Sequence, residues 1–300
     1  MLWHSFQFHR LALTRFLTVF PFRPLTLFTT HKSPAKTLTY WHRPHTSKNR
    51  LPVLFIQGIG IGLYPYVNFL AQINQTSKED ITNGDIGIIA IEIMPISFRI
   101  THAALEKDEM CKEILSILKK HDWEKVVLVS HSYGSVISTH LLQHTETRPL
   151  IGPIFLIDPV AFLLHLPDVA YNFTCRKPTR ANEHQLYYFA SMDMGVAHTL
   201  GRRFFWSENI LWKSDIKDRR TTVVISGKDL IVDTEAVGRY LAADDSGTVI
   251  DEHWKDRTWK GNGLDILWFN DLDHAQVFDS KANCDILVNV VRGYSLRMSS

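Results

Sequence analysis

The chain alternates between short apolar runs, rich in β-branched residues, and longer stretches with helical periodicity. An unbroken apolar run such as residues 126–129 is typical of a strand buried on both faces. Between two of these runs, apolar residues at helical spacing trace one face with charges opposite: Leu105, Cys111, Ile114, Leu115 and Leu118. The alternation predicts the α/β class, a mostly parallel twisted sheet of about eight strands with helices on both faces.

The turn signals between the runs set the expected bounds of the strands. We expect strands at residues 25–30, 37–42, 53–57, 86–93, 126–130, 153–157, 221–226 and 264–270. The first two flank Ser33 and Pro34, so they are predicted to form a leading antiparallel hairpin.

The apolar run that ends at Ser130 breaks at a serine and continues as a helix. Residues 130–134 read Ser-His-Ser-Tyr-Gly, with a small residue two positions before and two positions after Ser132. Such a turn between strand and helix is typical of a nucleophile elbow, which holds the serine hydroxyl above the end of a sheet. We therefore predict Ser132 as a nucleophile. The neighbouring His131 is expected to point to the other side of the elbow and pack in the core.

A serine hydroxyl becomes a nucleophile when a base takes its proton and an acid orients that base. Where an elbow serine leads, the acid and then the histidine follow along the chain at strand ends. Asp229 follows the strand at 221–226 and His274 follows the strand at 264–270, so these two are the predicted acid and base. Asp158, at the end of the strand at 153–157, is the alternative acid. Asp233 fits better as the start of a helix.

Two backbone amides are predicted to bind the oxyanion that forms during acyl transfer. One belongs to Tyr133, directly after the nucleophile. The other belongs to Ile59, in the glycine-rich turn after the strand at 53–57. The Gly-x-Gly of this turn is not interpreted as a dinucleotide loop, because no third glycine opens a helix in register.

These three motifs, in this order, make the chain resemble the α/β-hydrolase superfamily from about residue 25 to residue 295. The resemblance implies a serine hydrolase that needs no cofactor. Ser130 and Gln57 depart from the family pattern, which usually has glycine and histidine at these positions. Segments 58–66 and 206–212 are also similar to a group of uncharacterised fungal hydrolases, which adds no substrate.

The segment from about residue 160 to residue 215 is too long to be a simple connection. We predict that it is a helical cap, or lid, inserted before the strand that carries the acid. Its many aromatic rings predict an apolar roof over the serine. The alternative is that the rings only attach the cap to the core. A length of 300 residues and a hydrophobic content of 45% suit one catalytic domain, residues 25–300, which includes this cap.

The amino-terminal residues 1–24 form a basic, apolar extension. The net charge is only +2, but no acidic residue precedes Glu79. Arg10, Arg15 and Arg23 interrupt the apolar runs well short of the ~20 residues that cross a bilayer, so no transmembrane helix is expected. A mitochondrial presequence, a segment that contacts a membrane surface, and a structural extension of the core all fit this composition.

Other classes of function have no support in the sequence. The basic segment has no nucleic-acid-binding signature beside it, so no nucleic acid partner is predicted. The cysteines, Cys111, Cys175 and Cys284, are odd in number and far apart, which favours neither a disulfide framework nor a metal site. No metal is predicted, and the expected location is intracellular.

The predicted reaction is cleavage of a small carboxylic ester or thioester with an apolar acyl group, through an acyl-enzyme on Ser132. Family members that hydrolyse epoxides or haloalkanes have an aspartate at the elbow, so the serine argues against those reactions. Acyl transfer to an alcohol uses the same residues and stays open. A catalytically silent protein that binds a ligand under the cap is the second hypothesis, because Ser130 and Gln57 depart from the family pattern.

Overall fold

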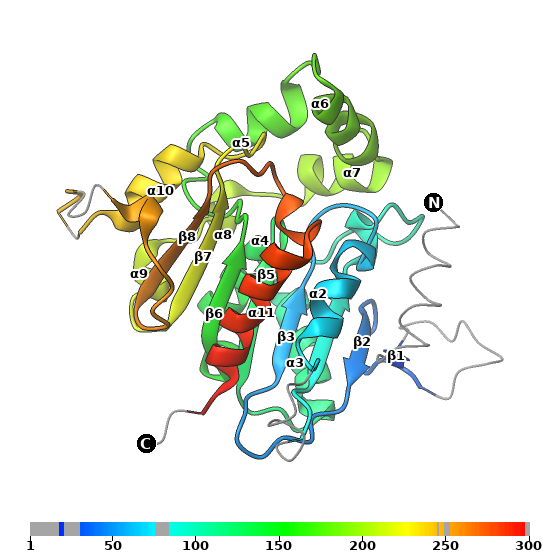
Figure 1. Ribbon diagram of the computed structural model, residues 1–300. Helices are drawn as coiled ribbons and strands as arrows, with labels where there is room; N and C mark the ends of the chain where they lie inside the picture. The colour runs from blue at the N-terminus through cyan, green and yellow to red at the C-terminus, as the bar shows by residue number, and fades with distance from the viewer. Residues whose placement is uncertain (1–17, 21–30, 76–83, 245, 249–252, 298–300) are drawn as a thin grey trace.

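The computed structural model describes residues 18–20, 31–75, 84–244, 246–248 and 253–297 (Figure 1). These residues form one eight-stranded sheet in the order β1-β2-β4-β3-β5-β6-β7-β8. The strands from β3 to β8 run parallel, and only β1 and β2 are antiparallel to their neighbours. The predicted mostly parallel α/β sheet is therefore confirmed. The strands are β1 (Thr18–Phe20), β2 (Thr39–Arg43), β3 (Val53–Ile56), β4 (Ile88–Glu92), β5 (Val126–His131), β6 (Ile151–Ile157), β7 (Thr221–Ser226) and β8 (Leu264–Phe269).

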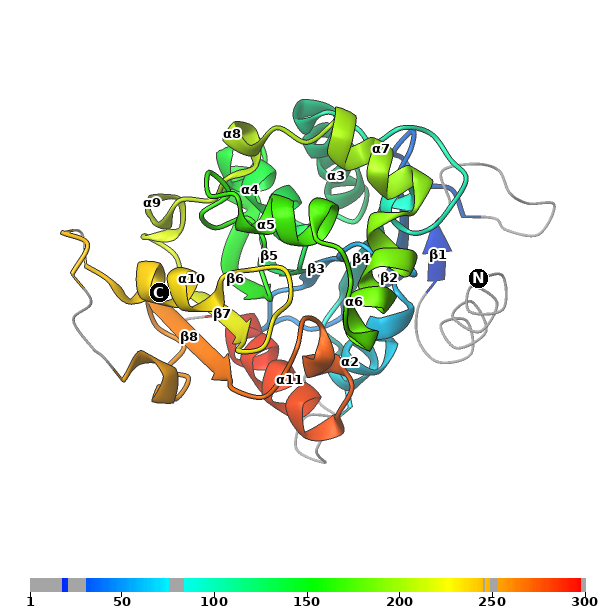
Figure 2. The same cartoon turned by 90° about the horizontal axis from the view of Figure 1, so that it is seen from above.

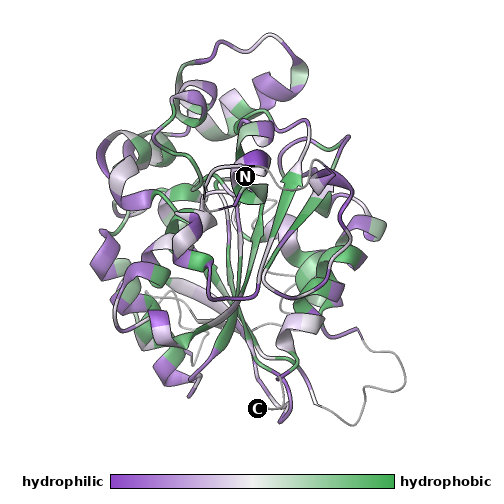
Figure 3. Cartoon of the chain, turned by 90° about the vertical axis from the view of Figure 1, so that its left-hand side faces the viewer, coloured by the Kyte–Doolittle hydropathy of each residue, from purple (hydrophilic) through white to green (hydrophobic). Residues whose placement is uncertain are grey.

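Helices cover both faces of the sheet, as Figures 1 and 3 show. One face packs against α2 (Val67–Gln72) and α11 (Lys281–Ser295). The other packs against α3 (Lys107–Lys120), α4 (Gly134–Gln143) and α10 (Thr234–Ala242). Successive strand residues point to opposite faces of the sheet. Val127 and Val129 therefore belong to the hydrophobic cluster on the side of α2 and α11, while Val126 and Leu128 belong to the cluster on the side of α3, α4 and α10. A strand between two helical layers has no polar face, which explains the unbroken apolar run.

Short 3-10 helices connect the main elements. They are η1 (Tyr64–Tyr66), η3 (Met94–Ile96), η4 (Arg148–Leu150), η7 (Trp254–Asp256) and η8 (Gln276–Phe278). Of these, η1 and η8 lie next to segments in which site residues were predicted. Phe278 of η8 packs edge-to-face on Tyr66 of η1, with 5.0 Å between the ring centres.

A run of short helices separates β6 from β7, where the cap was predicted. Figure 2 views the molecule from above and shows α5, α6 and α7 lying across the sheet. Two of the turns, η5 and η6, are π-helical. We call this segment the cap, as a name for its place between β6 and β7; it consists of α5 (Asp168–Ala170), η5 (Tyr171–Cys175), α6 (Ala181–Leu186), η6 (Tyr187–Ser191), α7 (Met194–Arg202), α8 (Trp206–Asn209) and α9 (Lys213–Ile216).

The amino-terminal edge of the sheet differs from the expected hairpin. On its outer side β2 pairs antiparallel with β1, which lies in the segment predicted as an extension, and on its inner side it pairs antiparallel with β4. The strand predicted at residues 25–30 lies outside the described residues. Nowhere in the described part of the chain is there a helix long and apolar enough to cross a bilayer.

Candidate active site

The Ser132 backbone adopts the strained conformation of a nucleophile elbow. Its φ is +52°, in the left-handed region that non-glycine residues rarely adopt. Ser132 follows β5, and α4 begins two residues later at Gly134. A Cβ atom on Gly134 would lie 2.4 Å from the carbonyl oxygen of Ile56 in β3, so a side chain at this position would force the helix away from the strand. The tight turn raises the serine above the end of the sheet.

Ser130 replaces the more common glycine without disturbing this packing. Its side chain is fully buried. The Ser138 hydroxyl, about one turn along α4, donates a hydrogen bond to the Ser130 hydroxyl at 2.8 Å. The departure from the family pattern therefore adds a polar contact between β5 and the helix that follows the nucleophile.

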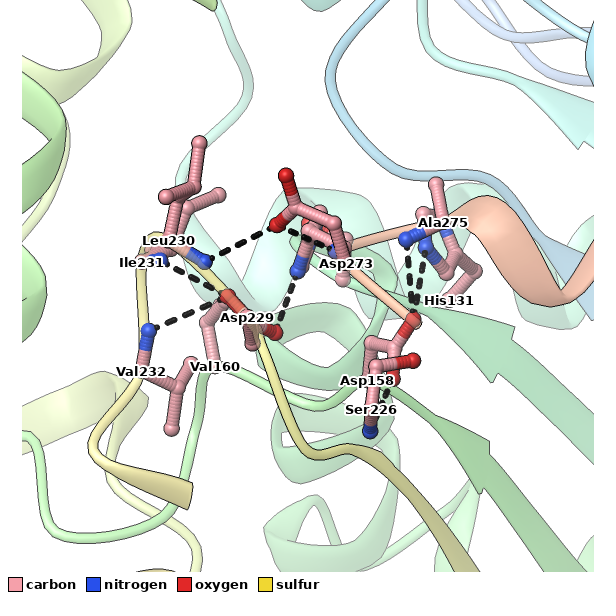
Figure 4. Close-up of polar contacts among 12 residues, drawn as sticks. His131, Asp158, Val160, Ser226, Asp229, Leu230, Ile231, Val232, Asp273 and Ala275 are labelled. Carbon is pink, nitrogen blue, oxygen red and sulfur yellow. Dashed lines mark hydrogen bonds and ion pairs between the residues drawn. The ribbon is translucent and has the colours of Figure 1, made fainter. Parts of the chain in front are cut away.

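The structure brings the three predicted side chains into one hydrogen-bonded series. Ser132 Oγ lies 2.8 Å from His274 Nε2, and Asp229 Oδ2 lies 2.7 Å from His274 Nδ1. The second oxygen of Asp229 accepts hydrogen bonds from the amides of Ile231 and Val232, at 2.7 and 3.2 Å (Figure 4). These amides hold the carboxylate so that its free edge faces the imidazole.

Charge around His274 favours its protonated form. Burial by itself lowers the pKa of the imidazole, because it penalises a charged ring. The carboxylates of Asp229, Asp158 and Asp273 outweigh this effect and raise the pKa to about 9. An imidazole in this setting is a strong proton acceptor once it is neutral, and the imidazolium that forms during catalysis would be stabilised.

Asp158, the alternative acid, points to backbone amides instead of the imidazole nitrogen. Its two oxygens accept hydrogen bonds from Ser226 at the end of β7, at 3.0 Å, and from Ala275 next to His274, at 2.9 Å (Figure 4). The side chain is almost fully buried, which raises the pKa of its carboxyl to about 6. Asp158 therefore fixes the loop that carries His274, while Asp229 makes the direct contact with the ring.

Asp273 was not singled out in the sequence, yet it joins the loops that carry the acid and the base. Its Oδ1 accepts hydrogen bonds from the amides of Leu230, at 3.1 Å, and of His274, at 2.7 Å. Its Oδ2 accepts one from the side chain of Asn182 in the cap, at 2.8 Å. Leu230 and Asn182 are distant from Asp273 along the chain, so no local pattern could have indicated this role.

The cap makes two further contacts with the loop that carries Asp229. The side chain of Asn172 donates to the carbonyl of Ile231 at 2.9 Å, and the Arg176 guanidinium donates to the carbonyl of Leu230 at 2.8 Å. Both donors lie at the η5 π-helical turn, and π-helical turns are frequent at functional sites. The position of the cap is thus coupled to the backbone on which Asp229 sits.

The glycine-rich turn after β3 passes directly beside Ser132. A Cβ atom on Gly58 would lie 2.7 Å from the Cβ of Ser132, so the two backbones are in close contact. The Gly58 amide donates to the Tyr66 hydroxyl and the Gly60 amide to the carbonyl of Ile96. Among the described residues, the Ile59 amide between them has no acceptor, and neither has the amide of Tyr133.

Gln57 lies in the core beneath the glycine-rich turn. It is fully buried, and its side-chain amide donates a hydrogen bond to the Ser97 hydroxyl. Ser97 in turn donates to the carbonyl of Ile93. Gln57 therefore supports the base of the turn from below and does not face the nucleophile.

The aromatic rings of the predicted roof divide into two groups. Phe162 is buried in the core, and Phe204 lies 6.3 Å from the ring of Tyr133, beside the nucleophile. A larger group is more than half exposed and comprises Tyr171, Tyr188, Phe189, Phe205 and Trp206. The first group attaches the cap to the core, whereas the second leaves apolar surface on the cap. Within the described residues, no group of three His, Cys, Asp or Glu side chains is arranged to hold a metal ion.

Comparison with solved structures supports the fold, whereas the two comparisons by sequence found no match. No protein-family model and no curated protein matches the chain. Among solved structures, it is similar to a membrane phospholipase A described as a bacterial virulence factor, with a TM-score of 0.60 and 10% identity over 97% of this chain and 91% of that one.

Two further structures show the same likeness. A meta-cleavage product hydrolase from Pseudomonas fluorescens has a TM-score of 0.54 and 14% identity, over 84% of this chain and 93% of that one. Naproxen esterase from Bacillus subtilis has a TM-score of 0.55 and 10% identity, over 95% and 96%. The closer resemblance to fungal hydrolases stays a prediction. The parallel sheet, the elbow after β5 and these structural neighbours together show that the chain has the α/β-hydrolase fold.

Proposed function

We propose that this protein is a serine hydrolase that cleaves a carboxylic ester or thioester through an acyl-enzyme on Ser132. The observation that carries the proposal is the unbroken contact series from Ser132 Oγ to His274 Nε2 and from His274 Nδ1 to Asp229, on an elbow with a strained backbone. Structural neighbours that are named as an esterase and a phospholipase A support ester chemistry for this fold.

In the proposed acylation step, His274 takes the proton of Ser132 as the oxygen attacks the substrate carbonyl. The amides of Ile59 and Tyr133 would bind the oxyanion of the tetrahedral intermediate. Collapse of the intermediate breaks the bond to the leaving group, which receives the proton from His274. Asp229 keeps the imidazole in the tautomer that places its lone pair on Nε2. Water then attacks the acyl-enzyme by the same route and releases the acid.

The cap supports a substrate with an apolar acyl group. Phe204 packs beside Tyr133, and the exposed rings add further apolar surface to the cap. Apolar side chains close to a reacting carbonyl favour hydrocarbon over polar groups and exclude water. Acyl transfer to an alcohol would use the same residues, and product analysis in the presence of an alcohol distinguishes it from hydrolysis.

A fluorophosphonate probe tests the nucleophile directly, because it phosphonylates an activated serine and loses fluoride. We expect rapid labelling of the parent protein and none of Ser132→Ala. Ser116→Ala, which changes a serine of α3 whose hydroxyl bonds the carbonyl of Glu113 in its own helix, serves as the matched control and should label normally. If the folded parent is not labelled, the enzyme proposal is wrong and a ligand-binding role takes its place.

The acid is tested in the same assay. Asp229→Asn should slow labelling far more than Asp158→Asn, because only Asp229 contacts the imidazole nitrogen. Loss of labelling in Asp158→Asn alone, with Asp229→Asn still active, would overturn the assignment.

A further inference from the structure

Tyr66 is a buried tyrosine whose hydroxyl lies among the loops of the proposed site. It ends η1 and closes segment 58–66, the motif that follows β3. Only 3% of the residue is exposed. Its hydroxyl lies 3.2 Å from the amide nitrogen of Gly58 and 2.8 Å from Nδ1 of His131. One side chain thus contacts both the glycine-rich turn and the residue that precedes the nucleophile.

The directions of these hydrogen bonds follow from the donors that are present. The Gly58 amide can only donate, so the Tyr66 oxygen accepts from it. The Tyr66 hydroxyl also bonds Nδ1 of His131, and the direction of this bond depends on which nitrogen of the imidazole carries the hydrogen. Burial and the nearby His274 hold the pKa of His131 well below its usual range, so the ring is neutral. Because Nε2 faces the Asp158 carboxylate, the favoured tautomer has its hydrogen on Nε2, and the Tyr66 hydroxyl then donates to Nδ1.

His131 carries the series on to the loop of the base. Its Nε2 faces Asp158 Oδ2 at 4.0 Å, and the same oxygen accepts the amide hydrogen of Ala275. The rings of His131 and His274 lie 5.2 Å apart. Hydrogen bonds therefore join the glycine-rich turn to His131 through Tyr66, and the charge of Asp158, which binds the loop that carries His274, lies close to the other side of the His131 ring.

We propose that Tyr66 is a positioning residue that holds the Ile59 amide in place for the oxyanion, with His131 as its anchor. The Ile59 amide follows directly after the residue whose amide Tyr66 binds. Gly58 has close contact with Ser132 and His131 but no side chain of its own to fix it. Donors for an oxyanion stabilise it only when they are held in advance at the position where charge develops. The inference rests on the proposed hydrolase function.

Tyr66→Phe removes a single oxygen and leaves the ring packing unchanged. We expect kcat for an activated ester to fall about 10-fold or more, with KM nearly unchanged, because a donor to the transition state is displaced. The affinity for a trifluoromethyl ketone, which forms an oxyanion on adding to Ser132, should fall in parallel. Tyr294→Phe is the matched control, since its buried hydroxyl bonds Thr222 away from the site. It should leave kcat and ketone affinity unchanged.

A pair of His131 variants tests the anchor and covers the case in which Tyr66→Phe does not fold. Asparagine keeps a hydrogen-bond acceptor near the place of Nδ1, whereas leucine has similar bulk and no acceptor. We expect His131→Asn to keep kcat within about 3-fold of the parent and His131→Leu to lose about 10-fold. The kcat of the double variant Tyr66→Phe/His131→Leu should be little lower than that of either single variant, because both changes break the same contact between Tyr66 and His131.

The outcomes separate this inference from the proposed function. If the parent hydrolyses esters and Tyr66→Phe matches it in kcat and ketone affinity, the positioning role is wrong and the hydrolase proposal stands. Equal losses in His131→Asn and His131→Leu would also overturn the role, because the acceptor would not matter. A parent that neither labels with fluorophosphonate nor cleaves esters overturns both.

Discussion

At the scale of single residues, the carboxylates around His274 would determine the pH range in which the proposed site is active. His274 must be neutral to accept the Ser132 proton, and its pKa is raised to about 9. We therefore expect kcat/KM to rise with pH along a limb that lies above 6.5 and extends toward 9. Asp229→Asn removes the largest favourable charge, so the limb should shift to lower pH while the maximum rate falls by about 10³–10⁴-fold. A limb that stays in place in the variant would contradict this account.

The raised pKa of His274 also makes the stability of the fold depend on pH. The pKa of His274 is higher in the folded chain than its ordinary value of 6.5. Its contribution to folding is therefore complete below pH 6.5 and is lost as the pH rises through about 9. In the proposed mechanism, the neutral imidazole that catalysis requires therefore forms in the pH range where this contribution to stability disappears.

Asp273 offers a second prediction, because its charge and its hydrogen bonds can be separated. Asp273→Asn keeps an oxygen for the amides of Leu230 and His274 but removes a charge that raises the pKa of His274. We expect the limb of the pH profile to move to lower pH, with a smaller loss of rate than in Asp229→Asn. Asp271→Asn is the matched control in the same loop, since Asp271 is exposed and pairs with Lys228. Equal shifts in both variants would contradict the specific role of Asp273.

The residues that meet in the candidate site could be predicted from the sequence where each of them follows the end of a strand. Ser132, Asp229 and His274 each follow a parallel strand, so the topology places them at one edge of the sheet. The choice between Asp229 and Asp158 depends on loop geometry: Asp158 has a φ of +43°, and its carboxylate binds backbone amides. Tyr66 gave no signal, because its partners are brought together only by the tertiary fold.

At the scale of elements, strand positions were predictable and strand ends were less so. The strand predicted at 221–226 coincides with β7, whereas β6 starts at Ile151, two residues before its predicted start. The first residue of the predicted strand, Pro153, has no N–H group to donate to a neighbouring strand. The structure accommodates it with a shift in register, so that Gly152 and Pro153 together lie opposite Val127.

The packing of β3 against α4 yields a prediction about stability. Gly134→Ala places a Cβ atom 2.4 Å from the carbonyl oxygen of Ile56, which the backbone can relieve only by moving the helix. We expect a loss of about 1–3 kcal/mol in the free energy of unfolding, measured with urea. Gly201→Ala in α7 is the matched control, because a Cβ atom there has no neighbour within 4 Å and alanine favours the helix. A variant at 134 as stable as the parent would contradict the close contact.

The cap contacts yield a prediction about the acid loop. Arg176→Ala removes the guanidinium that binds the carbonyl of Leu230. We expect faster hydrogen exchange at the amides of Ile231 and Val232 and a few-fold lower kcat, because these amides hold Asp229. Lys177→Ala, an exposed change next to it, should alter neither. Unchanged exchange in Arg176→Ala would show that the cap does not stabilise this loop.

At the scale of the whole molecule, the sheet and its two helical layers follow from apolar periodicity, but the use of the cap does not. The sequence predicted a cap between β6 and β7 through the length of that connection, which needs structure of its own. It could not divide the aromatic rings between core and surface, since both uses need the same side chains. The intracellular location and the alternatives for residues 1–24 stay predictions, and most of that segment lies outside the described residues.

The apolar cap above the elbow predicts how activity depends on acyl length. Each methylene group that enters an apolar pocket gains up to ~0.8 kcal/mol, so kcat/KM should rise from acetyl esters toward medium-chain esters. It should fall again when the chain exceeds the space beside Phe204 and Tyr133, whose rings lie 6.3 Å apart. A panel of p-nitrophenyl esters of increasing length measures this dependence, and Phe204→Ala should move the optimum to longer chains. Gln185→Ala, at an exposed position of α6, is the control and should leave the optimum unchanged. A preference for acetyl esters would mean that the rings only attach the cap to the core.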